Sequence, residues 1–161
     1  MVSTGSARAR GRIADLDRDA IRLSFDTKVI GPLMLAKHLA PRVNEGGSFV
    51  IFSGVAATKI TVGTLGVAIT NAAADTLARS LALELAPIRV NSISPGLVGD
   101  SPKWDAIVKA GENPVVKAMV ARTPTRRFPT MADVIHAVFF LLDNQSVNGH
   151  DLDINGGYFL M

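Results

Sequence analysis

The sequence predicts an α/β fold in which helices cover both faces of a parallel sheet. Residues 48–52 form a continuous apolar run of strand length, as expected for a strand that is buried on both faces. Helical apolar spacing precedes and follows this run, and a second strand at residues 88–94 comes after the second helix. Such alternation is typical of a doubly wound sheet. The 161 residues suffice for one core, so we expect residues 1–161 to form a single domain.

A long helix and a strand account for the first third of the chain. Apolar residues recur at helical spacing over residues 17–39, and Pro32 should kink or restart this helix because proline lacks a backbone N–H. Gly46 and Gly47 end the helical pattern before the strand at residues 48–52. Residues 1–2 resemble the end of a further strand, which brings the expected sheet to about four strands.

The middle of the chain predicts the longest helix, at residues 65–85. Its apolar stripe recurs every four residues, at Leu65, Ile69, Ala73, Leu77, Leu81 and Leu85. A second face of this helix consists of alanines, which are small enough to let another helix approach closely. The strand at residues 88–94 is then ended by Pro95 and Gly96.

The last third of the chain predicts a helix and a short strand after a loop-and-helix region at residues 100–125. Thr130 and Asp133 have the spacing of a capping box, so we expect a helix to begin there. Residues 151–154 form a short apolar and acidic run that ends at Gly156 and Gly157, which indicates a last strand and a turn.

The composition excludes several functional classes. The chain has no cysteine, which excludes disulfides and thiolate chemistry and fits a reducing cytoplasm. His38, His136 and His150 lack metal-ligand spacing, so we expect no metal site. The net charge of +3 lies in two small arginine clusters rather than in a dense basic stripe, which argues against nucleic-acid binding. No apolar run approaches the roughly 20 residues that cross a bilayer, so we expect no membrane association and a cytoplasmic location.

Three segments resemble the short-chain dehydrogenase/reductase family: residues 84–91, 94–96 and 153–157. The resemblance covers nearly the whole chain, and it implies a Rossmann-like fold with NAD(P)-dependent oxidoreductase chemistry. Residues 1–4 align with the end of the family's fourth strand, so the chain corresponds to the C-terminal portion of that fold. The family's glycine-rich turn, which holds the cofactor pyrophosphate at a helix N-terminus, belongs to the portion that comes before.

The catalytic positions of the family are changed in this sequence. The family opens one helix with a Tyr-x-x-x-Lys pair, in which the tyrosine donates a proton and the lysine lowers its pKa and holds the cofactor ribose. The resemblance places Val67 at the tyrosine position and Asn71 at the lysine position. The family's serine falls on Gly54, beside Ser53, and its asparagine falls on Lys28. We therefore expect Lys28, Ser53 and Asn71 to form a polar cluster that is either vestigial or an alternative proton relay.

The resemblance also implies where a cofactor would lie. Pro95, Gly96 and Val98 correspond to the turn that faces the cofactor in the family. Because the glycine-rich cradle has no counterpart in these residues, we expect no tightly bound cofactor, and NAD or NADP if any. The choice between the two and the identity of the substrate are not readable from these residues.

Two functions remain open at this point. The first is a non-catalytic structural or interaction module that forms a homodimer or homotetramer through the helices at residues 25–39 and 65–85, which pair in the family. The second is an NAD(P)-dependent oxidoreductase that reduces a carbonyl or oxidises an alcohol, either as a fragment of a longer enzyme or through the alternative relay. A start codon assigned too far downstream would explain the missing portion but not the changed catalytic positions.

Overall fold

A computed structural model describes residues 9–102, 104 and 113–161. Three strands form a parallel sheet in chain order: β1 (Ser48–Phe52), β2 (Arg89–Pro95) and β3 (Asp151–Ile154). In the register of the sheet, Ser48 lies beside Arg89 and Ser92 lies beside Asp151. The predicted parallel sheet is confirmed, whereas the expected strand at residues 1–2 lies outside the described residues.

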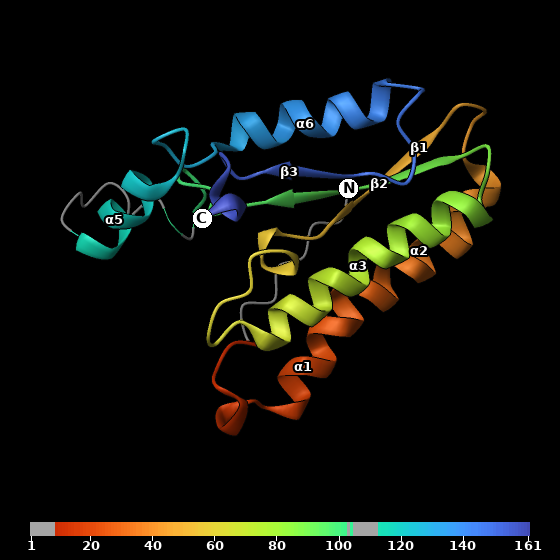
Figure 1. The fold of residues 1–161 in the computed structure, drawn as a ribbon. Coiled ribbons are helices and arrows are strands. Elements are labelled where there is room, and N and C mark those ends of the chain that lie inside the picture. The colour runs from red at the N-terminus through yellow and green to blue at the C-terminus, as the bar shows by residue number, and fades with distance from the viewer. Residues whose placement is uncertain (1–8, 103, 105–112) are drawn as a thin grey trace.

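Helices cover both faces of this sheet, as Figure 1 shows. On one face, α2 (Gly31–Leu39) and α3 (Leu65–Glu84) lie side by side, and α6 (Met131–Asp143) covers the other face. The two outer elements are α1 (Arg18–Phe25), which contacts α3, and α5 (Pro114–Arg122). Within the described ranges, every helix falls short of the length or the apolar character that a transmembrane segment requires.

Each face of the sheet has its own apolar core. The core beneath α2 and α3 consists of the buried residues Ala36, Ile51, Ala74, Ala78, Leu81, Ala82 and Val90. The core beneath α6 consists of the buried residues Ile93, Val134, Ala137 and Leu141. The two cores fill alternate positions of the strands, as the two-residue period of a strand requires. This arrangement confirms a doubly wound, partial Rossmann-like fold.

The helical segment from Arg18 to Leu39 is interrupted by a π-helical turn, η2 (Asp26–Ile30). At the end of this turn, the Gly31 N–H donates to the Asp26 carbonyl five residues earlier. Pro32 then occupies the start of α2, where a missing N–H matters least. A side chain on Gly31 would place its Cβ 3.1 Å from the Asp26 oxygen, so glycine suits the tight turn. The restart expected at Pro32 therefore takes the form of a π turn that contains Lys28.

A buried arginine fastens β2 to the end of α6. Arg89 is 6% exposed, and its Nη1 donates to the carbonyls of Leu141 and Asn144 at 2.8 Å each. Its Nη2 donates to the Leu142 carbonyl at 2.6 Å. These carbonyls lie at the C-terminal end of the helix, where the helix dipole favours a cation.

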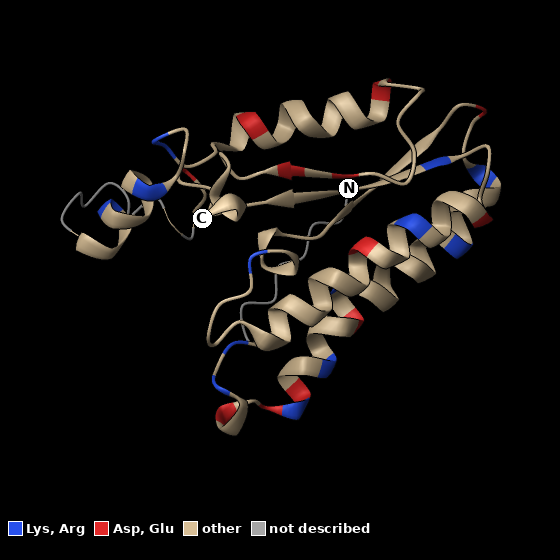
Figure 2. Cartoon of the chain, viewed as in Figure 1, with Lys and Arg blue, Asp and Glu red and all other residues tan. Residues whose placement is uncertain are grey.

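The start of α6 confirms the predicted capping box. Thr130 Oγ1 accepts from the Asp133 N–H at 3.2 Å, and Asp133 Oδ2 accepts from the Thr130 N–H at 2.8 Å. Arg127 Nη1 also contacts Asp133 Oδ2 at 2.6 Å. The Arg127 guanidinium, with help from Thr130, holds the pKa of Asp133 well below its usual range. Figure 2 shows that the α6 ribbon carries charge only near its two ends, whereas α1 and α3 each carry both basic and acidic residues.

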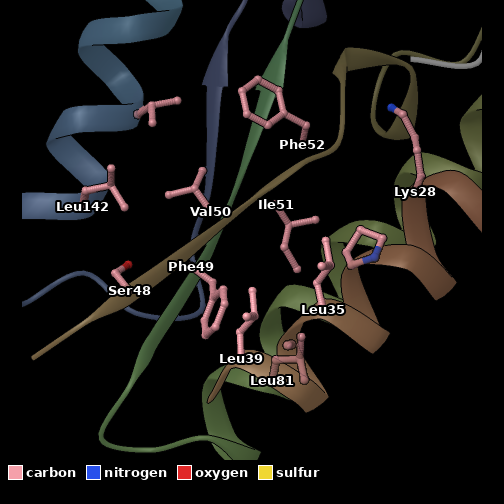
Figure 3. A pocket seen from close by; sticks show the side chains of 13 residues that line it. Lys28, Leu35, Leu39, Ser48, Phe49, Val50, Ile51, Phe52, Leu81 and Leu142 are labelled. Atoms are coloured by element: carbon pink, nitrogen blue, oxygen red, sulfur yellow. The ribbon is translucent and has the colours of Figure 1, made fainter. Parts of the chain in front are cut away.

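An apolar pocket of about 360 Å³ runs along β1 between α2 and α6. Its walls include Leu35 and Leu39 of α2, as well as Phe49 and Ile51 of β1. Figure 3 shows these side chains facing one another, with Lys28 standing apart from them at one end of the pocket. The polar cluster expected from the sequence thus lies beside this apolar space rather than inside it.

Candidate active site

The candidate site lies at the edge of the sheet where β1 and β2 end. Ser53 follows β1, and its N–H donates to the Ile93 carbonyl of β2 at 2.9 Å. Pro95 is the last residue of β2. Because both strands are parallel, their carboxyl ends lie at the same edge, where ligands bind in open α/β sheets. Lys28 reaches this edge from the π turn, and Asn71 reaches it from the first half of α3.

Lys28 joins the three residues that the sequence singled out. Its Nζ donates to Asn71 Oδ1 at 2.5 Å and to the Ser53 carbonyl oxygen at 2.8 Å. The structure therefore brings Lys28, Ser53 and Asn71 together, as expected. Burial lowers the pKa of Lys28 to about 8, and the negative charge of Asp75 opposes this fall. An ammonium with such a pKa can release a proton near neutral pH.

Asn71 and Gly54 fit each other closely. Asn71 is 3% exposed, and its Nδ2 donates to the Gly54 carbonyl at 3.2 Å. A side chain at Gly54 would place its Cβ only 2.9 Å from this Nδ2 atom. The Asn71 amide thus fills the space that a side chain at residue 54 needs. The Asn71 side chain and the backbone at Gly54 are therefore closely packed in the structure.

Ser53 contributes its backbone oxygen to the cluster rather than its hydroxyl. The Oγ atom donates to the Asn71 backbone carbonyl at 3.1 Å, and the residue is 5% exposed. This places the hydroxyl between β1 and α3. A role for Ser53 in orienting a substrate through its hydroxyl would require this hydrogen bond to break.

Val67 and Tyr158 occupy different places in the structure. Val67 is half-buried on α3 and has no group that can exchange a proton. Tyr158 lies in the short helix η5 (Tyr158–Leu160), with Lys59 Nζ 6.0 Å from the centre of its ring. This distance is at the outer limit of a cation–π contact, so Tyr158 has a packing partner.

Asp75 is a buried acid near the site that sequence reasoning missed. It lies on α3 one turn after Asn71 and is 7% exposed. Burial raises the pKa of Asp75 to about 6, and nearby Asp151 adds to the rise, while the hydroxyls of Ser53 and Ser92 oppose it. The sequence could have indicated this residue, because Asp75 is four residues after Asn71 and therefore lies on the same face of a helix that is rich in alanine.

The turn after β2 holds the three residues expected to face a cofactor. Pro95 and Gly96 are half-buried, and the Gly96 N–H donates to the Ile154 carbonyl at 2.9 Å. A Cβ at Gly96 would lie 2.9 Å from the Cβ of Asn155, so the close approach to the end of β3 requires glycine. Val98 packs against the core beneath α6 and is half-buried there.

The sequence is similar to a family profile and to curated proteins. The profile described as Enoyl-(Acyl carrier protein) reductase matches residues 1–159. Short-chain dehydrogenase/reductase ucsE from Acremonium sp is 36% identical over 135 residues, which cover 81% of this chain and 50% of that protein. Short-chain dehydrogenase/reductase ATR9 from Stachybotrys chlorohalonatus is 34% identical over 154 residues, which cover 92% of this chain and 58% of that protein. The chain spans between 50% and 58% of the length of these two relatives.

The fold is similar to solved structures of dehydrogenases. A small-chain dehydrogenase in complex with NADPH has a TM-score of 0.88 and 31% identity, with 99% of this chain and 72% of that chain covered. An NAD⁺-bound xylitol dehydrogenase has a TM-score of 0.84 and 26% identity, with 96% of this chain and 66% of that chain covered. Together with the profile match along nearly the whole sequence, these similarities show that the chain belongs to the short-chain dehydrogenase/reductase family.

Proposed function

We propose that this chain works as part of an NAD(P)-dependent oxidoreductase that reduces a carbonyl group or oxidises an alcohol. The observation that carries the proposal is the Lys28 ammonium, which two acceptors hold at the carboxyl edge of the sheet. Relatives described as dehydrogenases and reductases, and a structural neighbour in complex with NADPH, favour this function over a non-catalytic module.

The residues at the end of β2 fit a nicotinamide cofactor. Gly96 lacks a side chain and, with Pro95, forms a half-buried turn at the same sheet edge as Lys28. This turn would hold the nicotinamide half of NAD or NADP, while Val98 supports it from the core beneath α6. When bound, the nicotinamide supplies or accepts the hydride. The remaining contacts to the cofactor belong to the portion of the family fold that this chain does not span.

Lys28 would move the proton in this reaction. Its ammonium has three hydrogens, and two of them are used by Asn71 Oδ1 and the Ser53 carbonyl. These two bonds orient the Nζ atom, so the third hydrogen can go to the substrate oxygen directly or through one water molecule. In the reductive direction, the N–H bond breaks, the new O–H bond forms and Lys28 becomes a neutral amine. Val67 contributes an apolar surface and no proton.

Cofactor titration tests the proposal. Adding NADPH or NADH to the chain should give a saturable change in nucleotide fluorescence, and the bound protein should oxidise NADPH in the presence of an aldehyde, ketone or quinone panel. Lys28→Met should keep cofactor binding and lose turnover. Lys37→Met, a change of an exposed lysine on α2, is the matched control and should keep both. Absence of any saturable signal at millimolar cofactor would contradict the proposal.

We also propose that the chain pairs with a second copy through α2 and α3. Several large apolar side chains on these helices are exposed: Met34, Leu35, Leu39, Leu65, Ile69 and Leu83. Such a surface favours association. Sedimentation at micromolar concentration should show a dimer or tetramer, and a monomer alone would contradict this pairing.

A further inference from the structure

Two groups of opposite charge lie beside the candidate site, the buried Asp75 and the half-buried Lys28. The Lys28 ammonium donates only to neutral oxygens, those of Ser53 and Asn71, among the described residues. The Asp75 carboxyl group is buried on α3, and its Oδ1 atom has no hydrogen-bond partner in the described part of the chain. Burying a charge without an opposite charge is costly. Among the described residues, neither group is hydrogen-bonded to a side chain of opposite charge.

The fold places these two groups on either side of one amide. Asn71 and Asp75 are four residues apart on α3, so their side chains lie on the same face, with Cβ atoms roughly 5–6 Å apart. Lys28 contacts the Asn71 side chain from the other helix. Asp75 thus lies one helical turn from the amide that holds the ammonium. The negative charge of Asp75 acts on the Lys28 ammonium across this amide.

The side chains that act on the Asp75 carboxyl are two hydroxyls, one acid and one exposed arginine. The hydroxyls of Ser53, which follows β1, and of Ser92, in the middle of β2, both favour its ionised form. Asp151 of β3 opposes ionisation, and its own carboxylate accepts from Ser92 Oγ at 2.9 Å. Arg79 of α3 also favours ionisation, but it has the smallest effect of these groups and is exposed.

The side chains around this cluster do not form a metal-ligand group in the described part of the chain. Among the described residues, no three histidine or acidic side chains are placed to hold a metal ion. The cluster contains one cation, Lys28, that is itself partly buried and faces the carboxyl edge of the sheet.

We propose that Asp75 is a positioning residue for Lys28, and that its buried carboxylate is the counter-charge that keeps the ammonium protonated until a substrate oxygen takes the proton. The catalytic meaning of this inference rests on the proposed function. The electrostatic link between the two side chains does not, because it exists in the chain without any substrate. At neutral pH both groups are charged, since the pKa of Lys28 is about 8 and that of Asp75 is about 6.

The link can be measured by NMR without turnover. In protein labelled with ¹³C at lysine Cε, the Lys28 signal is assigned by its loss in Lys28→Met, and its pKa is then followed by titration. Asp75→Asn should lower the pKa of Lys28 further, because it removes the charge that opposes the effect of burial. Asp153→Asn is the matched control, since Asp153 is a half-buried carboxyl of β3 that also lies near Asp151. An unchanged Lys28 titration in Asp75→Asn, or an equal shift in Asp153→Asn, would overturn the inference.

A reciprocal measurement covers the case in which Asp75→Asn does not fold. Linkage requires that loss of the Lys28 charge raises the pKa of Asp75 by the same amount of free energy. Carboxyl ¹³C titration of Lys28→Met should therefore show Asp75 titrating at higher pH than in the unmodified chain, and no change would contradict the link.

Measurement of turnover distinguishes the proposed oxidoreductase function from the proposed role of Asp75. If NADPH oxidation is absent while the two titrations remain coupled, the proposed function fails and the electrostatic link stands. If NADPH oxidation occurs and its pH profile is the same in Asp75→Asn, the role of Asp75 as a positioning residue fails.

Discussion

The Lys28 ammonium donates a 2.5 Å hydrogen bond to Asn71 Oδ1 and so connects the π turn of one helix to α3. The family resemblance places an asparagine at residue 28 and a lysine at residue 71, and this chain has the two residue types exchanged. An amide and an ammonium still meet between the two helices. In this chain the ammonium comes from the π turn rather than from α3.

The first prediction concerns the pH dependence of carbonyl reduction. If Lys28 is the proton donor, the rate of reduction should fall as pH rises through about 8, where the ammonium loses its proton. Lys28→Met should lower the rate by roughly 10²–10⁴-fold and remove this alkaline limb. Stopped-flow measurement of NADPH oxidation from about pH 6 to about pH 10 tests the fall in rate and its absence in Lys28→Met. If the rate still falls at alkaline pH in Lys28→Met, a group other than Lys28 is the proton donor.

The second prediction concerns the fit between Gly54 and Asn71. Gly54→Ala should destabilise the fold by about 1–3 kcal/mol, because the new Cβ would lie 2.9 Å from Asn71 Nδ2. In the double variant with Asn71→Ala the cost should be smaller than the sum of the two single costs. Urea unfolding of all four proteins gives the coupling free energy. Strict additivity would show that the Asn71 side chain is not the obstacle.

The third prediction concerns the link between β2 and α6. Arg89→Met removes the donors to the carbonyls of Leu141, Leu142 and Asn144, so it should lower the free energy of unfolding by roughly 3 kcal/mol. Arg42→Met is a control because Arg42 is exposed, and it should change the free energy of unfolding by no more than about 0.5 kcal/mol. Equal effects of the two changes would contradict a special role for Arg89.

The fourth prediction concerns stability as a function of pH. The pKa of Asp75 is raised from 3.8 to about 6, so the native state binds more protons than the unfolded chain in this window, and stability should fall as pH rises through it. The pKa of Lys28 is lowered from 10.5 to about 8, so the unfolded chain binds more protons there, and stability should rise between these values.

Two variants assign these slopes to their side chains. Asp75→Asn should remove the Asp75 contribution to the acid slope, and Lys28→Met should remove the Lys28 contribution to the alkaline slope. Urea midpoints collected along a pH series measure both. An alkaline slope that survives unchanged in Lys28→Met would show that its protonation is not linked to folding.

Local patterns predicted the regular elements well. The apolar run at residues 48–52 coincides with β1, and the four-residue stripe of residues 65–85 ends one residue after α3. The capping box of Thr130 and Asp133 marks the start of α6, because the hydrogen bonds of a cap depend on nearby residues alone.

The site was predictable only where the family resemblance reached. It placed Lys28, Ser53 and Asn71 together, but not the hydroxyl of Ser53, whose direction depends on the Asn71 carbonyl across the fold. Asp75 belongs to no motif, and its burial and unpaired Oδ1 result from the packing of α3 on the sheet. Such properties require tertiary contacts that spacing along one chain does not contain.

The π turn before Gly31 makes the number of residues in this segment as important as their identity. Each residue of an α-helix turns the chain by about 100°, so removal of one residue between Asp26 and Gly31 would rotate one end of the segment against the other by that angle. Either Lys28 would swing away from Asn71, or Ala36 would leave the core it shares with Ile51. A one-residue deletion there should therefore be harmful whichever residue is removed.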